Sequence, residues 1–504
     1  MLLLLFLIIQ SLNTTALTSL ELNQIYLNLQ TAIGDQSRTF PALEIRPGAS
    51  SVLAYNQRKN IIFVDEKVMR ICDEFGENAP DAIAFLLAHE MTHFYQKHQW
   101  EEAGFASEFL TKQSTFNEHE EDERAADLYG AFVTHLAGYQ SVKLIPALFE
   151  KVYQAYGLEA DLLDYPPLSE RQAVAQQVCQ QAKELILLFD TANYLNAIGE
   201  HLAAATAYEH LLQLVRFKEL YNNLGASLVA EAARMSTATG TNFRYPLVLD
   251  WDIPLRDGAA DRAELLEKAI GYLAQATQMD ATHYNAFINL ACAYTLSDKL
   301  ADAKTLLKQM QGLPQDAQQL AEVNILLGII KAKSGQKAEA ETIFKAVTVT
   351  ASSGGIQQLA QQNISILKQE IIKTGMANNV SSEQQIGGID LLYQNEFAFE
   401  EMDLFDTFTT EENALQFHET TTARLLHFVT SDKTIALLFA KKNAQLTTEQ
   451  LGVNTPFATL QTTYPNGNIL PHNRGYYYVV PSHHLVFRCN QQNKVVEWGT
   501  YAVY

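Results

Sequence analysis

The chain has 504 residues, of which 47% are hydrophobic, and 36 Lys+Arg against 57 Asp+Glu give a formal net charge of -21. This composition supplies several packed cores and excludes a globally disordered protein. Because nucleic acids and anionic membranes are bound through basic patches, the acidic balance argues against both as partners. The length predicts roughly three or four domains.

The N-terminus begins with an apolar run, Leu2–Ile9, which is too short to span a bilayer but has the length of a signal-peptide core. Small residues around Ser11–Ala16 could supply a cleavage site, although no Lys or Arg precedes Arg38. We therefore expect a signal peptide over residues 1–18, an exported protein of the periplasm or envelope, and no transmembrane span in the mature chain. A buried first strand or helix, or a start codon assigned too late, are the alternatives.

Short strands are expected next. The sequence predicts strands at Ala42–Arg46, Ser51–Tyr55 and Ile61–Asp65. Pro80 suits the first turn of a following helix, which we expect to continue to about His98. The expected arrangement is a mixed sheet that precedes a long helix.

That helix carries the stretch Ala84–Phe94, reading AFLLAHEMTHF. Residues four apart lie on one helix face, so His89 and His93 can hold a single metal ion. Glu90 lies beside them, where a carboxylate can accept a proton from a metal-bound water. The pattern is typical of zinc peptidases.

A second helix is predicted over Asn117–Gly138, and it carries Glu123 and, one turn later, Asp127. A zinc site with two histidines needs a carboxylate as its third protein ligand and leaves one position for water. Glu123 fits that role, and Asp127 could accept the spare N–H of a ligating histidine. His119, on the same face, is a weaker candidate for a ligand or for substrate contact. A solvated acidic face is the alternative interpretation of this run.

The two motifs together, HEMTH at 89–93 and ERAAD at 123–127, resemble the HExxH and ExxAD pair of the M48 family of zinc metallopeptidases. The resemblance covers roughly residues 40 to 180. It implies a zincin-like α+β domain with one Zn²⁺ per chain, held by His89, His93 and Glu123. It also implies Glu90 as the catalytic base.

A further family feature, a His-Pro pair followed by an arginine, corresponds here to YPPLSER, Tyr165–Arg171. Tyr165 stands where relatives carry a histidine that can bind the zinc as a fourth ligand. Tyrosine is a poorer zinc ligand than histidine. We therefore expect either that this fourth ligand is absent here, or that Tyr165 donates a hydrogen bond to the oxyanion formed in the reaction. A tyrosine packed beside a proline turn is the alternative. Arg171 matches the family's arginine and is expected to order the loop.

Beyond about residue 180 the chain becomes rich in alanine, leucine and glutamine, with helical periodicity. Small and aromatic residues recur at close to the 34-residue period of tetratricopeptide repeats, with an irregular insert around Met235–Asp261. The aligned positions include Leu224, Gly225, Leu290, Ala291, Leu327, Gly328 and Phe344. Such repeats usually bind proteins or peptides on their concave face, so we expect protein clients there.

After the polar segment Lys373–Gln385 the pattern changes to short strands, and the chain ends in an expected antiparallel meander over Tyr476–Val480, Leu485–Cys489 and Val495–Tyr504. His483 and His484 are interpreted as turn residues rather than metal ligands, because adjacent strand residues face opposite ways. The four cysteines are far apart and form no CxxC pair, which predicts buried thiols.

The predicted architecture is multidomain. A peptidase domain over 19–180 is followed by an all-α repeat domain over 181–372, a linker over 373–385 and a small α+β or mainly β domain over 386–504, whose role the sequence leaves open. The pairing of an M48-like domain with such repeats resembles periplasmic quality-control proteases, and this resemblance implies zinc-dependent endoproteolysis of misfolded or unassembled envelope proteins. An exported chaperone or assembly factor with a silent or tightly regulated peptidase is the alternative, and a purely structural zinc site is disfavoured because such sites carry four protein ligands. Chelator-sensitive proteolysis would discriminate these hypotheses.

Overall fold

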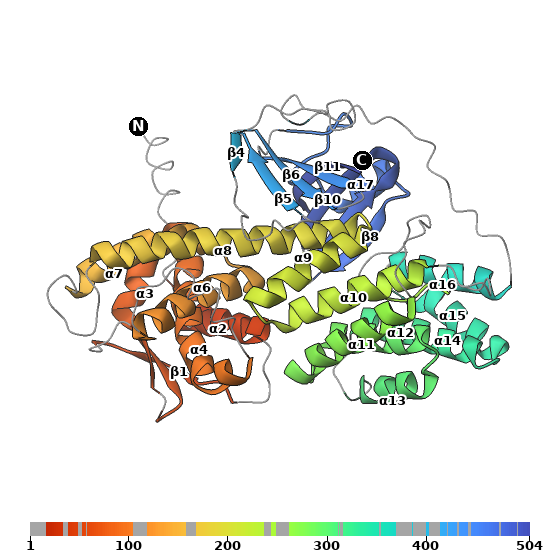
Figure 1. The fold of residues 1–504 in the computed structure, drawn as a ribbon, viewed down its shortest axis with the longest axis horizontal. Helices are drawn as coiled ribbons and strands as arrows, with labels where there is room; N and C mark the ends of the chain where they lie inside the picture. The colour runs from red at the N-terminus through yellow and green to blue at the C-terminus, as the bar shows by residue number, and fades with distance from the viewer. Residues whose placement is uncertain are drawn as a thin grey trace, which may run out of the picture. The chain divides into compact units, whose positions relative to one another are not determined.

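The computed structural model describes residues 17–33, 39–48, 53–56, 58–103, 118–157, 168–235, 243–247, 262–310, 312, 316–351, 354–368, 386, 400–402, 414–420, 422–430, 433–441, 445–472, 475–490 and 492–503. It is multidomain, with a mainly helical region followed by an antiparallel C-terminal sheet (Figure 1). Two compact units are formed, Met1–Leu188 with Gln213–Arg216, and Phe189–Leu212 with Phe217–Tyr504. Their boundary falls inside helix α8 (Leu168–Ala197).

A three-stranded mixed sheet lies early in the first unit, close to the positions that the sequence predicts. Its strands are β1 (Ala42–Arg46), β2 (Leu53–Asn56) and β3 (Ile61–Asp65), in the order β1-β3-β2. β1 is parallel to the central β3 and β2 is antiparallel to it, so β2 forms one edge of the sheet.

Helices account for most of the other described residues of the first unit. They are α2 (Ser19–Ile33), α3 (Glu66–Asp73), η2 (Gly76–Asn78), α4 (Ala79–Ala103), α6 (Glu118–Ala137), η3 (Val142–Leu144), α7 (Ile145–Tyr156) and the first part of α8. Asp65 caps α3 by accepting a hydrogen bond from the backbone N–H of Lys67. The middle of α4 is buried around its whole circumference, with Ala82–Ala88 all under 9% exposed, so this helix is the core of the unit.

The second unit begins with helical pairs. They are formed by α9 (His201–Leu214), α10 (Lys218–Arg234), α11 (Arg262–Met279), α12 (Tyr284–Leu296), α13 (Leu300–Met310), α14 (Ala317–Lys333), α15 (Lys337–Thr350) and α16 (Gly354–Leu367). A Cβ on Gly328 would lie 2.5 Å from the ring of Phe344, and one on Gly225 would lie 2.5 Å from Leu273. These glycines therefore let the paired helices approach, as the small residues of the repeat pattern predict.

The C-terminal strands form one antiparallel sheet of two meanders. The strands are β4 (Glu400–Met402), β5 (Ala414–Glu419), β6 (Ala423–Val429), β7 (Thr434–Ala440), β8 (Asn468–His472), β9 (Gly475–Val480), β10 (Leu485–Asn490) and β11 (Val495–Val503). Their order is β4-β5-β6-β7-β11-β10-β9-β8. The predicted terminal meander is thus confirmed, and it joins the first meander where β11 pairs with β7. The 3₁₀ helix η4 (Pro481–His483) makes the expected turn at the paired histidines.

Both faces of this sheet are buried. One face, with α17 (Phe457–Thr463) beside it, forms a core around Trp498, Phe487 and Tyr478. On the other face, Tyr194 of α8 packs its ring 4.6 Å from Phe439 and 4.9 Å from Tyr477. The sheet and the end of α8 therefore belong to one packed unit.

All four cysteines are buried and free, as predicted. In the part of the chain that the structure describes, no helix has both the length and the apolar character needed to cross a membrane. Most of the predicted signal peptide, residues 1–16, lies outside the described residues. The predicted linker over 373–385 lies outside them as well.

Candidate metal centre

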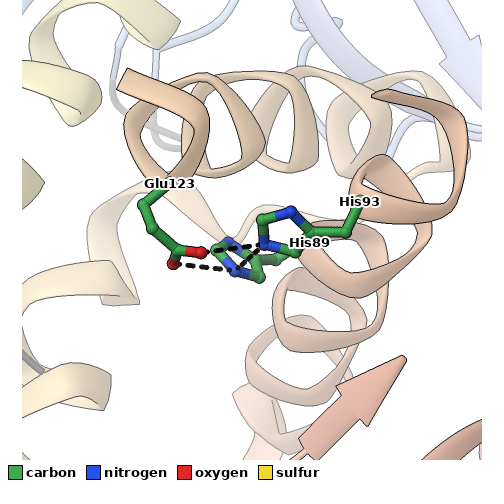
Figure 2. A group of neighbouring side chains, drawn as sticks. All are labelled: His89, His93 and Glu123. Carbon is green, nitrogen blue, oxygen red and sulfur yellow. Dashed lines mark hydrogen bonds and ion pairs between the residues drawn. The ribbon is translucent and has the colours of Figure 1, made fainter. Parts of the chain in front are cut away.

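Two helices bring three metal-ligating side chains together. α4 carries His89 and His93, α6 carries Glu123, and their ligand atoms lie within 4.8 Å of one another (Figure 2). The Nε2 atoms of the two histidines are 3.1 Å apart. The Glu123 carboxylate lies 3.5 Å from His89 Nε2 and 3.2 Å from His93 Nε2.

These separations fit a zinc ion. Zinc bonds of about 2.0–2.1 Å at tetrahedral angles place neighbouring ligand atoms about 3.3–3.4 Å apart, which is close to all three observed distances. Two imidazole nitrogens and one carboxylate are also the donor set of catalytic rather than structural zinc sites. The residues present therefore fit the metal.

Asp127 holds the orientation of His89. It lies one turn after Glu123 on α6, is fully buried, and places Oδ1 2.8 Å from His89 Nδ1. A carboxylate at Nδ1 retains the proton there and leaves Nε2 as the metal-binding atom.

Arg171, at the start of α8, forms a two-point ion pair with Asp127. Its Nη2 donates to Asp127 Oδ1 at 2.9 Å, and its Nη1 lies 2.8 Å from Oδ2. The guanidinium also lies 4.1 Å from the ring centroid of Phe149. Arg171 was expected to order a loop; the geometry shows it neutralising a buried carboxylate in contact with a candidate ligand.

The electrostatics favour a cation. Burial by itself lowers the pKa of His89, but hydrogen bonds with Asp127 and Glu123 outweigh burial and the pKa is raised. Burial raises the pKa of Glu123, whereas its hydrogen bonds with His89 and His93 lower that pKa by more, so the net shift is well below the usual range. Positive charge at this position is therefore strongly stabilised by the surrounding carboxylates.

Glu90 lies next to His89 in the sequence and accepts a hydrogen bond of 2.8 Å from the backbone N–H of Tyr55. Burial raises the pKa of Glu90, partly offset by His89 and His93 and by this hydrogen bond. Tyr55 is on the edge strand β2, opposite Ile62 of β3. Its N–H points away from β3 and toward α4, so the edge of the sheet and the carboxylate of Glu90 meet.

Sequence reasoning missed two contributors to this site. The N–H of Tyr55 leaves no residue-type signal, because any residue except proline would supply it. Gly130 of α6 packs against the backbone of His89. A glycine inside a predicted helix could have indicated such a close contact. Of the predicted site residues, Tyr165 lies outside the described residues, as does the side chain of His119.

Comparison with known proteins adds no assignment: no protein-family model matches the chain, and no curated protein matches its sequence.

Proposed function

We propose that the protein is an M48-like zinc metalloendopeptidase. The observation that carries this proposal is the convergence of His89 Nε2, His93 Nε2 and the Glu123 carboxylate at zinc-like separations. The buried carboxylate of Glu90 is close enough to interact electrostatically with both histidines. Three protein ligands would leave one coordination position open, which distinguishes a catalytic from a structural site.

The chemistry divides between the metal and the side chains. Zinc, when bound, would polarise a peptide carbonyl and lower the pKa of a coordinated water toward neutrality. Glu90 is the base that accepts the proton and can then return it to the leaving amine. Its raised pKa suits that exchange better than the pKa of an exposed glutamate would. Asp127 and Arg171 hold His89 in the tautomer that the site needs. Tyr165 remains our candidate for a further hydrogen-bond donor to the oxyanion.

The edge strand supports a polypeptide substrate. The outward N–H of Tyr55 is already bonded to Glu90, so an extended peptide added along the rest of this edge would lie beside Glu90. Strand addition of this kind supplies affinity through main-chain hydrogen bonds and accepts many sequences. Unfolded or unassembled proteins are the substrate class with exposed extended segments.

The helical pairs after residue 188 support client selection by tetratricopeptide-type repeats. Gly225 against Leu273 and Gly328 against Phe344 give the close packing that such repeats require. Together with the apolar run Leu2–Ile9, this favours an exported quality-control protease of the periplasm or envelope.

The test compares wild-type protein with Glu90→Gln and His93→Ala. Zinc-loaded wild type should cleave an unfolded substrate such as casein, and a chelator should abolish the cleavage. Glu90→Gln should bind zinc normally but cleave at least a hundredfold more slowly, because it cannot accept a proton. His93→Ala should lose zinc and activity together. Full cleavage by Glu90→Gln would refute the mechanism, and zinc binding without cleavage by wild type would favour the chaperone alternative.

A further inference from the structure

Helix α6 approaches helix α4 most closely at Gly130. A Cβ built on this glycine would lie 3.0 Å from the backbone N of His89, 3.3 Å from its Cα and 3.3 Å from the carbonyl carbon of Ala88. These contacts are tighter than ordinary Cβ contacts. A side chain at this position therefore requires the neighbouring backbone to move by a few tenths of an ångström.

The atoms in the way are backbone atoms of a buried helix. At Gly225 and Gly328 an added Cβ would meet the side chains of Leu273 and Phe344, which can change rotamer. At Gly130 no rotamer change can relieve the contact, because the obstacle is the main chain of α4. Alanine would have to be accommodated by a shift of one helix against the other.

Such a shift acts on the metal centre. Gly130, Asp127 and Glu123 are separated by three and four residues, so they lie along one face of α6. That face supplies the carboxylates that contact His89 and His93 on α4. A separation of the helices at Gly130 therefore shifts Asp127 relative to His89, and Glu123 relative to both histidines.

We propose that Gly130 is a positioning residue of the metal centre, which sets the distance between α4 and α6 so that His89, His93 and Glu123 can bind one zinc ion. This inference rests on the proposed zinc site. Relief of a 3.0 Å contact needs a movement of a few tenths of an ångström. Zinc–ligand distances tolerate deviations of about 0.2 Å, and the side chains of a functional site tolerate displacements of about 0.5 Å. We expect Gly130→Ala to weaken zinc binding about ten- to a hundredfold, the range found for disturbed partners of metal ligands.

The experiment measures the zinc affinity of the full chain by competition with a chromogenic chelator. The matched control is Gly271→Ala in α11, where an added Cβ meets nothing within 4 Å. Far-UV circular dichroism of the metal-free variants checks their folding. The absorption spectrum of Co²⁺-loaded protein reports the coordination geometry of whatever fraction of Gly130→Ala folds.

The inference predicts weaker zinc binding and an altered Co²⁺ spectrum for Gly130→Ala alone, with Gly271→Ala matching wild type. Wild-type affinity and spectrum in Gly130→Ala would overturn it and leave the proposed function intact. An unaltered Co²⁺ spectrum in a poorly folded Gly130→Ala would also overturn it, since the glycine would then serve folding alone. A wild-type chain that binds no zinc would overturn both proposals.

Discussion

Arg171→Met removes one partner of a buried ion pair and leaves the other in place. Asp127 is fully buried, and the Arg171 side chain is only 11% exposed, so solvent has little access to the carboxylate when the guanidinium is lost. An uncompensated buried charge costs about 3–5 kcal/mol, and because His89 Nδ1 stays 2.8 Å from Asp127 we expect the lower part of that range, about 3–4 kcal/mol. Methionine retains the apolar contact with Phe149, so most of the loss should be electrostatic.

Arg46 provides a matched control. It pairs with Glu44 at 2.8 Å and lies 3.8 Å from the ring centroid of Phe63, so an arginine, a carboxylate and a phenylalanine meet there as well. Both charged side chains are more than 40% exposed there, and an exposed pair contributes at most about 1 kcal/mol. Arg46→Met should therefore be nearly neutral.

Hydrogen exchange of the α6 amides in metal-free protein is the suitable assay, because it reports the opening of this helix without the second unit. Arg171→Met should raise the opening constant by about two to three orders of magnitude, since 1.4 kcal/mol is a factor of ten. Adding Asp127→Asn should restore part of the protection, because the buried charge that lost its arginine is then gone. Equal exchange in Arg171→Met and Arg46→Met would refute the reasoning.

Three further changes test other parts of the structure. Burial raises the pKa of Glu322 from 4.5 to about 7. The free energy of unfolding of the second unit should therefore fall by up to about 3 kcal/mol as the pH rises from about 4.5 to 7, because the buried carboxyl must then ionise. Urea melts at different pH values should show this fall in wild type and not in Glu322→Gln. The buried hydroxyl of Tyr194 donates to Glu497, so Tyr194→Phe should lower the unfolding free energy of the same unit by about 1–3 kcal/mol, and an unchanged melt would contradict the contact. Tyr55→Pro removes the N–H that donates to Glu90 and should reduce kcat roughly tenfold while the zinc affinity stays unchanged. Tyr55→Ala retains this N–H and should reduce kcat by less.

Local patterns predicted the elements of the first unit well. The strands at 42–46 and 61–65 and the helices around His89 and Glu123 are found where alternation and helical spacing place them. The spacing of four residues brings His89 and His93 together whatever the rest of the chain does. Their meeting with Glu123 depends on how α6 packs on α4, which the motif resemblance implied and periodicity alone could not supply.

The contacts that the sequence did not predict are long-range or involve the backbone. Arg171 is 44 residues from Asp127, and nothing local to YPPLSER indicates which carboxylate it contacts. Alternation in β6 and β11 makes Arg424 and Glu497 resemble solvent-facing residues, yet they form a 2.6 Å ion pair on a sheet face that Tyr194 covers. Which face of a two-sided sheet is covered is decided by distant elements, so strand patterns leave it open.

The most direct test of the central claim is the zinc stoichiometry of purified protein, measured by elemental analysis after reconstitution and removal of free metal. The proposal predicts one zinc per chain in wild type and in Glu90→Gln. His89→Ala, His93→Ala and Glu123→Ala should each retain little or none under the same conditions, because two protein ligands bind zinc weakly. A wild-type chain without zinc, or variants of all three residues that retain a full equivalent, would contradict the assignment of these residues as the metal centre.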